Sequence, residues 1–325
     1  MRMIKCGRKE LSSLIVTSIL GPHGDSGNFP LNLLPAHRAV VKVVLETGTT
    51  VIAKSATLPK RSGNYRWWAP WRCIKYVRSP ETGKIIGLIN AFDLTNDGVA
   101  AAAYGIKKSI EKGFKVVPSY AVEFMKQGVA LAMSDVSREL REAVEIFRDE
   151  LGPYFWMLEV DVSCSNTGEM LAENTDKILI VARYLRSIFE GCISFKLGPE
   201  HSVEMAIELE AIGIDIVHVL NAFPHRLINP DKFSPLASFG GGAYSGRTMF
   251  DRALAINTEF RRKLKMRMIL GGGISDRQHI KRYVDMLEET SGSKEEKNSL
   301  SICSAVRSDP EETIEMLRSG KYLFG

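Results

Sequence analysis

The sequence predicts an α/β fold of the (β/α)8-barrel (TIM-barrel) class, and three observations lead to that prediction. Short apolar runs alternate with longer amphipathic stretches, as they do when strands and helices alternate. Eight such runs are nearly continuously apolar, which is typical of parallel strands buried on both faces. The length of 325 residues suits eight strand–helix units in one domain, which we expect to span residues 1–325.

The first strand is predicted at residues 14–18, followed by a helix over residues 35–46 that begins with a proline and ends at Gly48. The later strands are predicted at residues 51–55, 115–119, 157–161, 192–196, 214–219, 266–270 and 300–303. The later helices are predicted at residues 100–112, 138–150, 174–189, 202–212, 252–265 and 280–289.

Two segments interrupt the alternation. Residues 57–84 are basic and aromatic, and they predict a hairpin excursion after strand 2 that leads into the apolar run 85–90. Residues 288–299 predict a polar surface loop, and the glycine-rich residues 240–246 predict a second loop.

Composition and charge exclude several classes of protein. The net charge of +5 is too small by itself to indicate a nucleic-acid partner. No stretch approaches about 18 uninterrupted apolar residues, so we expect no membrane helix and a soluble, cytoplasmic protein. The five cysteines are scattered and the six histidines lack metal-type spacing, so we expect neither a disulfide framework nor a metal site. His218 reads as a satisfied core histidine.

Polar residues and glycines follow the predicted strands, at the ends where such barrels carry their catalytic groups. The most informative is Cys164, in the tetrapeptide SCSN after the fourth strand. A thiol acts as a general base only as the thiolate, and the free thiol has a pKa of about 8.5, so a cation or a closed loop must assist it. The alternative is a buried cysteine that serves only as a small apolar side chain.

Lys54 and Lys196 each end a strand, where an inward-facing lysine needs a partner. A reduced flavin, which is negative near N1, is one candidate partner, and outward extension to solvent is the alternative. The glycines 271–273 with Ser304 match the phosphate site that many barrels build after strands seven and eight. A tight turn would also explain these glycines.

At these positions the sequence resembles the dihydroorotate dehydrogenases, from about residue 50 to residue 320. Residues 54–57 and 63–64 are similar to the family's K-S-x-T…G-N-P, and residues 89–98 to I-N-S-M-G-L-P-N-x-G. Residues 159–166 resemble E-x-N-x-S-C-P-N. Residues 245–254 resemble S-G-x-x-x-x-P-x-A-L, and residues 272–274 resemble the late G-G-I.

The resemblance implies bound FMN and oxidation of dihydroorotate to orotate in pyrimidine biosynthesis, with Cys164 removing the C5 proton. The flavin would be held by Lys54, Ser55, Lys196, Asn221, Ser245, Gly246, Gly272, Gly273 and Ser304. The substrate would be held by Asn90, Leu94, Asp161, Asn166 and Ala222. The use of cysteine as the base resembles the soluble class of the family. In that class the electron acceptor is either a soluble molecule such as fumarate or a partner subunit. Homodimers are frequent in it.

The sequence departs from the family pattern at several of these positions. Asp161 occupies a position where the family has asparagine, and Ala222 one where it has serine or threonine. Ser165 replaces a proline of the family pattern, and Cys303 and Asp93 each replace a glycine. Because an ionised aspartate only accepts hydrogen bonds, Asp161 either stays protonated, meets a donor group, or serves a substrate other than dihydroorotate.

Two other functions compete with this prediction. A tRNA dihydrouridine synthase-like flavin barrel would use the basic and aromatic residues 60–78 to bind RNA, although these residues also suit a dimer surface. A flavin-free, phosphate-binding isomerase or lyase would use Lys196 to form a Schiff base.

Overall fold

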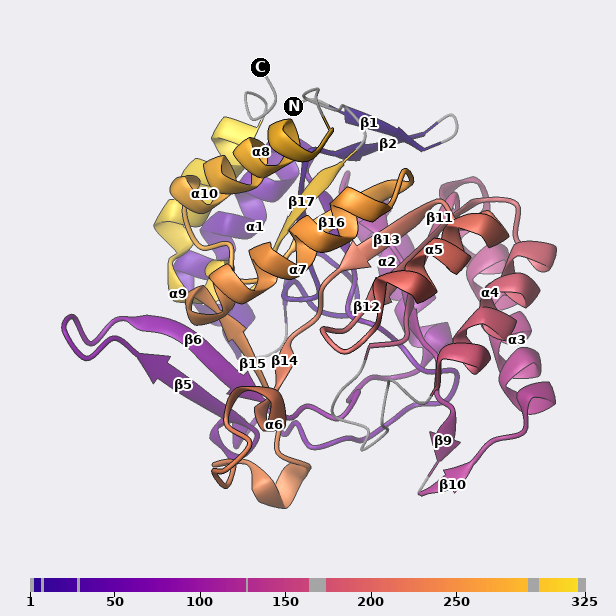
Figure 1. The fold of residues 1–325 in the computed structure, drawn as a ribbon, viewed down its shortest axis with the longest axis horizontal. Coiled ribbons are helices and arrows are strands. Elements are labelled where there is room, and N and C mark those ends of the chain that lie inside the picture. Colours follow the sequence, from indigo (N-terminus) through magenta and orange to yellow (C-terminus); the bar gives the residue numbers. More distant parts are fainter. Residues whose placement is uncertain are drawn as a thin grey trace.

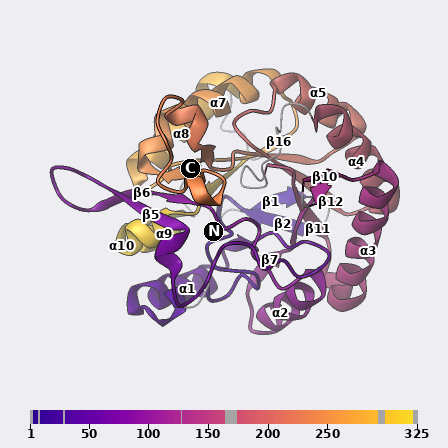
Figure 2. The same cartoon turned by 90° about the horizontal axis from the view of Figure 1, so that it is seen from below.

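A barrel of parallel strands inside a ring of helices forms the body of the molecule (Figure 1, Figure 2). The computed structural model describes residues 3–6, 9–27, 30–126, 128–163, 174–291 and 298–320. The barrel fold predicted from the sequence is confirmed.

All strands of the central sheet are parallel, and their order is β7-β4-β3-β17-β16-β13-β12-β11-β8. The two outermost strands, β7 and β8, follow each other along the chain and are separated only by Pro118, which has no N–H to donate to the ladder. They are two halves of one barrel strand. The sheet therefore closes on itself as eight strands, each of which overlaps a range predicted from the sequence. Their bounds are β3 (Leu14–Thr17), β4 (Thr50–Ile52), β7 (Lys115–Val117), β8 (Ser119–Ala121), β11 (Met157–Asp161), β12 (Cys192–Leu197), β13 (Ile216–Val219), β16 (Arg267–Gly271) and β17 (Ser299–Ile302).

The helices cover the outside of the barrel (Figure 2). The seven predicted helices are present, with ends that differ by up to five residues, and α10 was not predicted. The longer helices are α1 (Pro35–Thr47), α2 (Val99–Glu111), α3 (Met133–Leu151), α4 (Thr175–Ile188), α5 (Val203–Ile212), α7 (Phe250–Lys263), α8 (Arg277–Ser291) and α10 (Pro310–Ser319). The short ones are α6 (His225–Ile228), α9 (Ala305–Ser308) and the 3₁₀ turns η1 (Leu31–Leu33), η2 (Pro70–Arg72), η3 (Gly152–Tyr154), η5 (Ala237–Phe239) and η6 (Arg247–Met249).

Helix α1 shows how local sequence sets these boundaries. Pro35 occupies the first turn, where its missing N–H costs nothing. Gly48 adopts φ 60° at the C-cap, a left-handed conformation that glycine reaches without a Cβ penalty. Both ends of the helix therefore lie where the sequence predicted them.

An antiparallel hairpin that the sequence did not predict, β1 (Met3–Cys6) and β2 (Lys9–Ser12), covers one end of the barrel (Figure 1). Leu11 of β2 joins a buried cluster inside that end. Burial of a leucine side chain contributes roughly 1.5–3 kcal/mol to stability. The cluster also contains Ile15, Ile52, Val117, Met157, Cys192, Ile216 and Ile269, from seven barrel strands.

A four-stranded antiparallel sheet lies at the opposite end of the barrel, in the order β14-β15-β6-β5 (Figure 1). The predicted hairpin excursion is confirmed by the pairing of β5 (Ile74–Arg78) with β6 (Ile85–Asn90). The prediction of a loop over residues 240–246 is wrong in part, because β15 (Ala243–Gly246) pairs with β6 and with β14 (Phe223–Pro224). A further small hairpin joins β9 (Met125–Lys126) to β10 (Val129–Ala130).

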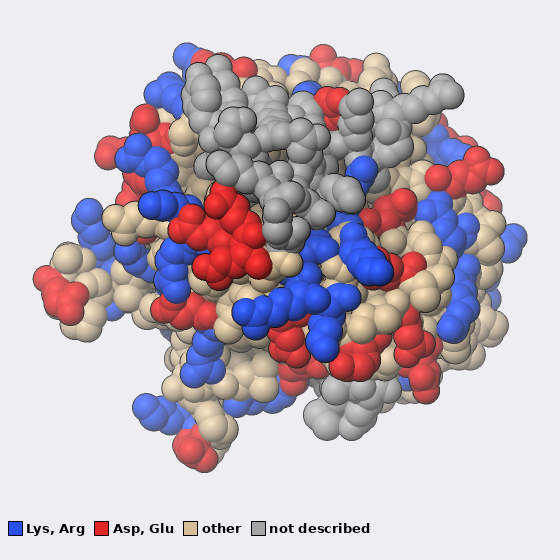
Figure 3. Space-filling view, turned by 45° about the horizontal axis from the view of Figure 1, so that its top comes forward, with Lys and Arg blue, Asp and Glu red and all other residues tan. Residues whose placement is uncertain are grey.

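Three other expectations can be compared with the structure. No helix in the described ranges is long and apolar enough to cross a membrane. On the face seen in Figure 3, basic and acidic side chains are interspersed, in keeping with the small net charge. Cys73 and Cys303 are free thiols, but Cys192 is disulfide-bonded, which the scattered cysteine spacing did not predict.

Candidate functional site

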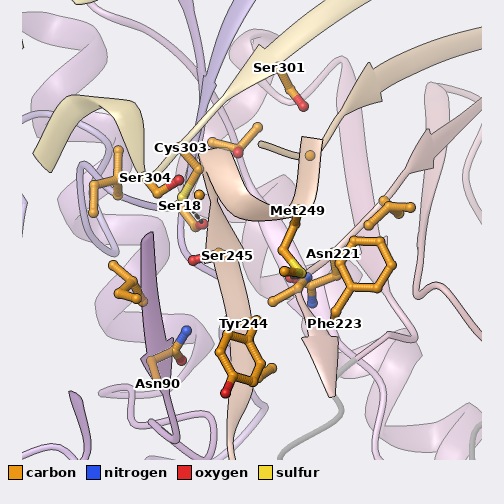
Figure 4. A pocket seen from close by; sticks show the side chains of 18 of the residues that line it. Ser18, Asn90, Asn221, Phe223, Tyr244, Ser245, Met249, Ser301, Cys303 and Ser304 are labelled. Carbon is orange, nitrogen blue, oxygen red and sulfur yellow. Dashed lines mark hydrogen bonds between the residues drawn. The ribbon is translucent and has the colours of Figure 1, made fainter. Parts of the chain in front are cut away.

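A cavity of about 230 Å³ opens where the carboxyl ends of the barrel strands meet the antiparallel sheet. Its wall combines side chains from strand ends, such as Asn221 and Ser304, with Asn90 of β6 and Tyr244 of β15 (Figure 4). The antiparallel sheet thus supplies one side of the cavity and the barrel supplies the other. This is the end of the barrel at which the sequence predicted a site.

The residues that the sequence predicted for cofactor and substrate gather around this one cavity. Thirteen of the fifteen predicted positions line it, and the other two, Cys164 and Asn166, lie outside the described residues. The thirteen come from distant parts of the chain: Lys54, Ser55, Asn90, Leu94, Asp161, Lys196, Asn221, Ala222, Ser245, Gly246, Gly272, Gly273 and Ser304.

The period of the strands explains how polar groups come to lie in the middle of the barrel. Successive side chains of a strand alternate between its two faces, so residues two apart share the interior face. The hairpin β1–β2 covers one end of the barrel, and the apolar cluster lies inside that end. On five strands, the residue two positions after the cluster residue is polar and faces the same interior. The successive pairs are Ile15 and Thr17, Ile52 and Lys54, Val117 and Ser119, Met157 and Glu159, and Ile216 and His218.

His218 and Glu159 form a buried pair in this polar layer. Nδ1 of His218 lies 2.7 Å from Oε2 of Glu159, and Nε2 lies 3.0 Å from the Ser301 hydroxyl. Both ring nitrogens therefore have partners, and His218 is the satisfied core histidine predicted from the sequence. It also lines the cavity together with Ser301, which sequence reasoning missed. The position of His218 two residues after Ile216 of the apolar cluster could have revealed that it faces the interior.

Asp161 ends β11 and is 4% exposed in the cavity wall. Its Oδ1 accepts hydrogen bonds from the Ser163 backbone N–H and hydroxyl, at 3.0 and 2.6 Å. Its Oδ2 accepts one from Ser55 at 2.9 Å and lies 3.7 Å from Nζ of Lys196. Burial alone raises the pKa of Asp161, but the Lys196 ammonium and the Ser163 and Ser55 hydrogen bonds outweigh it and lower that pKa overall. Asp161 is thus ionised and meets donor groups, the second of the three possibilities left open by the sequence.

The two predicted lysines both line the cavity rather than extending outward to solvent. Lys196 is 7% exposed and lies beside Asp161 on the neighbouring strand. Lys54 donates a hydrogen bond from Nζ to the Thr95 carbonyl oxygen, in the loop after β6. Two lysines, one just after β4 and one in β12, therefore line the same cavity.

Three glycines bring backbone close to the cavity in conformations that other residues rarely adopt. Gly246, Gly272 and Gly273 have φ values of 104°, 106° and 74°. A Cβ on Gly273 would lie 2.6 Å from the backbone of Phe250, and one on Gly246 would lie 2.5 Å from Cα of Gly87. These contacts involve backbone, which cannot move aside.

The glycines lie where barrels commonly bind phosphate. Gly272 and Gly273 follow β16, the seventh barrel strand, and Ser304 follows β17, the eighth, just before the short helix α9. Loops after these two strands and a short extra helix form the phosphate site of many barrels. The cavity therefore suits a ligand with a phosphate at this end and a ring that gains negative charge on reduction near the lysines, as FMN does.

The loops after β3 and β17 supply cavity residues that were not predicted. Ser18 and Cys303 lie side by side in the wall, with Oγ and Sγ 3.7 Å apart (Figure 4). Burial raises the pKa of the Cys303 thiol, although hydrogen bonds from Ser18 and the charge of Lys196 oppose that shift. The uncharged thiol thus takes the place of the glycine found in the family pattern.

Arg61 links three loops through ion pairs with two acidic residues. Arg61 pairs with Asp93 at 2.7 Å and with Glu123, which is 9% exposed. Asp93 and Leu94 are consecutive non-glycine residues with φ values of 52° and 53°. Such a conformation costs roughly 1–2 kcal/mol per residue. The ion pair with Arg61 explains how aspartate is held where the family pattern has glycine.

No group of three or more His, Cys, Asp or Glu side chains among the described residues is arranged to hold a metal ion. Polar groups of the cavity wall hydrogen-bond to one another. Asn221 illustrates this, because its Nδ2 donates to the Ser163 hydroxyl at 2.9 Å and its Oδ1 accepts from the Ala222 N–H.

Comparison with known proteins agrees with this geometry. Residues 38–283 match the family model described as Dihydroorotate dehydrogenase. Similar proteins include the catalytic subunits of dihydroorotate dehydrogenase B (NAD(+)) from Porphyromonas gingivalis, 24% identical over 230 residues, and Bacteroides fragilis, 26% identical over 229 residues. Each match covers 69% of this chain and 67% of the relative. The corresponding subunit of Caldicellulosiruptor saccharolyticus is 23% identical over 243 residues, 73% of this chain and 70% of the relative. Because the family model spans most of the barrel, the chain belongs to the dihydroorotate dehydrogenase family.

Proposed function

We propose that this protein is an FMN-dependent oxidoreductase that oxidises dihydroorotate, or a related dihydropyrimidine, in pyrimidine biosynthesis. One observation carries the proposal: thirteen residues predicted for flavin and substrate, from segments up to 250 residues apart, line a single cavity. If the motifs had been misread, we would not expect Lys54, Asn90 and Ser304 to line the same cavity.

The chain's own residues would divide the work as follows. Gly272, Gly273 and Ser304 would bind the FMN phosphate through backbone N–H groups and a hydroxyl. Lys54 and Lys196 would lie beside the ring, and the close approach of Gly246 leaves room for it. Bound FMN supplies the acceptor for a hydride from C6 of the substrate.

The substrate side of the proposal rests on a second group of residues. Asn90 would orient the pyrimidine through its amide, with Leu94, Asp161 and Ala222 shaping the wall around it. Cys164 is proposed as the base that takes the C5 proton, with Asn166 as a further substrate ligand. Both lie outside the described residues, so their roles rest on the resemblance of residues 159–166.

An absorbance spectrum of the purified protein tests the proposal. We expect flavin bands that bleach when dihydroorotate is added without oxygen. Flavin bands that do not bleach would support FMN as the cofactor and contradict dihydroorotate as the substrate. A colourless protein would contradict the proposal, and trapping of Lys196 by borohydride with a carbonyl substrate would then favour the isomerase or lyase alternative.

We further propose an electron-transfer partner. The similar proteins from three bacteria are named as catalytic subunits of an NAD(+)-dependent enzyme, which suggests that this chain passes electrons to a second subunit. A homodimer and a cytoplasmic location are part of the same proposal. Co-purification of a second subunit with the untagged chain from its own source would support it, and rapid reduction of fumarate by the isolated chain would contradict it.

A further inference from the structure

Asp161 and Lys196 are direct neighbours in the barrel sheet. Strands β11 and β12 are parallel, and their register places Asp161 opposite Lys196. Both side chains are more than nine-tenths buried, with 3.7 Å between Oδ2 and Nζ. Both line the cavity. The lysine expected to lie beside the bound anion therefore has a carboxylate next to it.

Three of the four acceptor positions of the carboxylate already hold hydrogen bonds, and the Lys196 ammonium lies 3.7 Å from the oxygen that carries the fourth. Each carboxylate oxygen accepts about two hydrogen bonds. Oδ1 already accepts two from Ser163, and Oδ2 accepts one from Ser55 and contacts Lys196. Asp161 therefore acts on whatever occupies the cavity mainly through its charge. This differs from the substrate-binding role implied by the resemblance.

We propose that Asp161 is a positioning residue that holds Lys196 and reduces the positive charge which Lys196 presents to the anionic end of the bound ring. The inference rests on the proposed function, in which that ring is a flavin. Opposite charges about 4 Å apart in a buried site largely cancel at longer range. With asparagine at position 161, the full charge of Lys196 would act on the ring.

The consequence for the reaction is a flavin that is harder to reduce. Reduction of the ring adds negative charge near N1, which a lysine stabilises and a neighbouring carboxylate destabilises. A flavin of lower potential gives electrons to weaker oxidants. The pair therefore favours a nicotinamide or iron–sulfur acceptor of low potential over fumarate.

Sulfite binding to the oxidised, FMN-loaded protein tests this inference without turnover. Sulfite donates an electron pair to flavin N5 and forms an N–S bond, and the displaced pair appears as negative charge at the N1 end. The dissociation constant of the adduct therefore reports the positive charge near that end. We expect Asp161→Asn to bind sulfite about tenfold more tightly than the wild type, as loss of one nearby buried charge implies. A tenfold change for a two-electron couple also moves the midpoint potential upward by about 30 mV.

Asparagine suits this position because it removes the charge and keeps the shape. Its oxygen can accept from Ser163, and its amide group can donate to the Ser55 hydroxyl, which has a second partner in Ser119 at 2.9 Å. Should Asp161→Asn fail to fold, Asp161→Ser removes the same charge in a smaller side chain. Thermal melting and flavin content establish that each variant is folded and loaded.

Two control variants separate charge from other effects. Ser163→Ala removes the hydroxyl hydrogen bond to Asp161, keeps the one from the backbone N–H and changes no charge, so its sulfite affinity should stay within about threefold of the wild type. Asp215→Asn removes a carboxylate that precedes β13, at the far end of the barrel from the cavity, and should leave sulfite binding unchanged.

The outcomes distinguish the two proposals. Flavin-loaded Asp161→Asn with wild-type sulfite affinity and midpoint potential would overturn the role of Asp161 and leave the proposed function standing. Equal changes in Asp161→Asn and Ser163→Ala would also overturn it, because hydrogen bonding and not charge would then be responsible. A wild-type protein that binds no flavin would instead contradict the proposed function.

Discussion

Nδ1 of His218 lies 2.7 Å from Oε2 of Glu159 in the interior of the barrel, where their side chains are 2% and 1% exposed. A charged or strongly polar group at such depth is tolerated only with a partner, and each of these residues is the other's closest one. The Ser301 hydroxyl lies 3.0 Å from Nε2, the other ring nitrogen of His218.

Truncation of one member of this pair should therefore be strongly destabilising. We expect His218→Leu to reduce the free energy of unfolding by about 3–5 kcal/mol, because Glu159 would remain buried without its partner. The double variant His218→Leu/Glu159→Leu should lose less than the sum of the two single variants. Urea unfolding of the four proteins in this cycle measures the coupling, and additive losses would show that the pair is not coupled.

Gly273 should tolerate no side chain. In Gly273→Ala the new Cβ would meet the backbone of Phe250 at 2.6 Å, in addition to the penalty of φ 74°. Gly83→Ala is a matched control, since Gly83 has φ 67° and no atom within 4 Å of its Cβ position. We expect the control to lose roughly 1–2 kcal/mol and Gly273→Ala to lose more and to bind less FMN. Equal losses would show that the space beside Phe250 is not limiting.

His201 should make the protein sensitive to mild acid. It is 5% exposed, and Nδ1 accepts a hydrogen bond from the Gly198 N–H at 2.9 Å. Burial lowers the pKa of His201 to about 4, and the nearby Asp161 opposes that shift only in part. In the unfolded chain, His201 takes up a proton as the pH falls below about 6.5, whereas in the folded chain it does not. The contribution of neutral His201 to the free energy of unfolding is therefore complete above pH 6.5 and is lost as the pH falls toward 4.

The expected size of this effect is about 2 kcal/mol between pH 7 and pH 5. Urea unfolding of the wild type and of His201→Gln at both pH values measures it. Burial also lowers the pKa of His37 and His279, so the wild type has a similar slope from these residues. Only the difference between the two proteins reports His201, and parallel pH profiles would refute the assignment.

The exposed tryptophans beside β5 should mark an interface between two copies of the chain. Trp67, Trp68 and Trp71 are 55%, 59% and 64% exposed, an unusual placement for such large apolar side chains. We expect the wild type to sediment as a dimer and the triple serine variant as a monomer with the same flavin content. A monomeric wild type that binds tRNA with a steep salt dependence would favour the RNA-binding alternative instead.

The barrel could be predicted because each strand carries its own signal. Runs such as residues 157–161 are apolar enough to read without knowing their neighbours. Strand β15 could not be predicted in this way, because its main partner β6 lies more than 150 residues earlier and residues 240–246 are rich in glycine. Helix α10 had local signals that were overlooked, an Asp309 N-cap followed by Pro310.

The residues that line the cavity could largely be predicted from the sequence, but the contacts between them could not. Lys54, Gly272 and Ser304 follow barrel strands. The carboxyl ends of the strands lie at the same end of a barrel, whichever side chains they carry. The partners of Asp161 depend on the register of β11 against β12 and on the side-chain conformations of Ser55 and Ser163, which no local pattern encodes. For the same reason the Arg61–Asp93 pair was invisible in the sequence.

The polar layer contains a row of four oxygen atoms that is one hydrogen short. Oε1 of Glu159, the Ser119 and Ser55 hydroxyls, and Oδ2 of Asp161 form a row with oxygen–oxygen distances of 3.4, 2.9 and 2.9 Å. Two hydroxyls carry two hydrogens, but the row has three contacts, so with both carboxylates ionised one contact has no hydrogen. Rotation of the hydroxyls moves that gap from one end of the row to the other without moving a heavy atom. One added proton would fill all three contacts, so the row has the geometry of a short path for a proton between the His218 layer and the cavity wall.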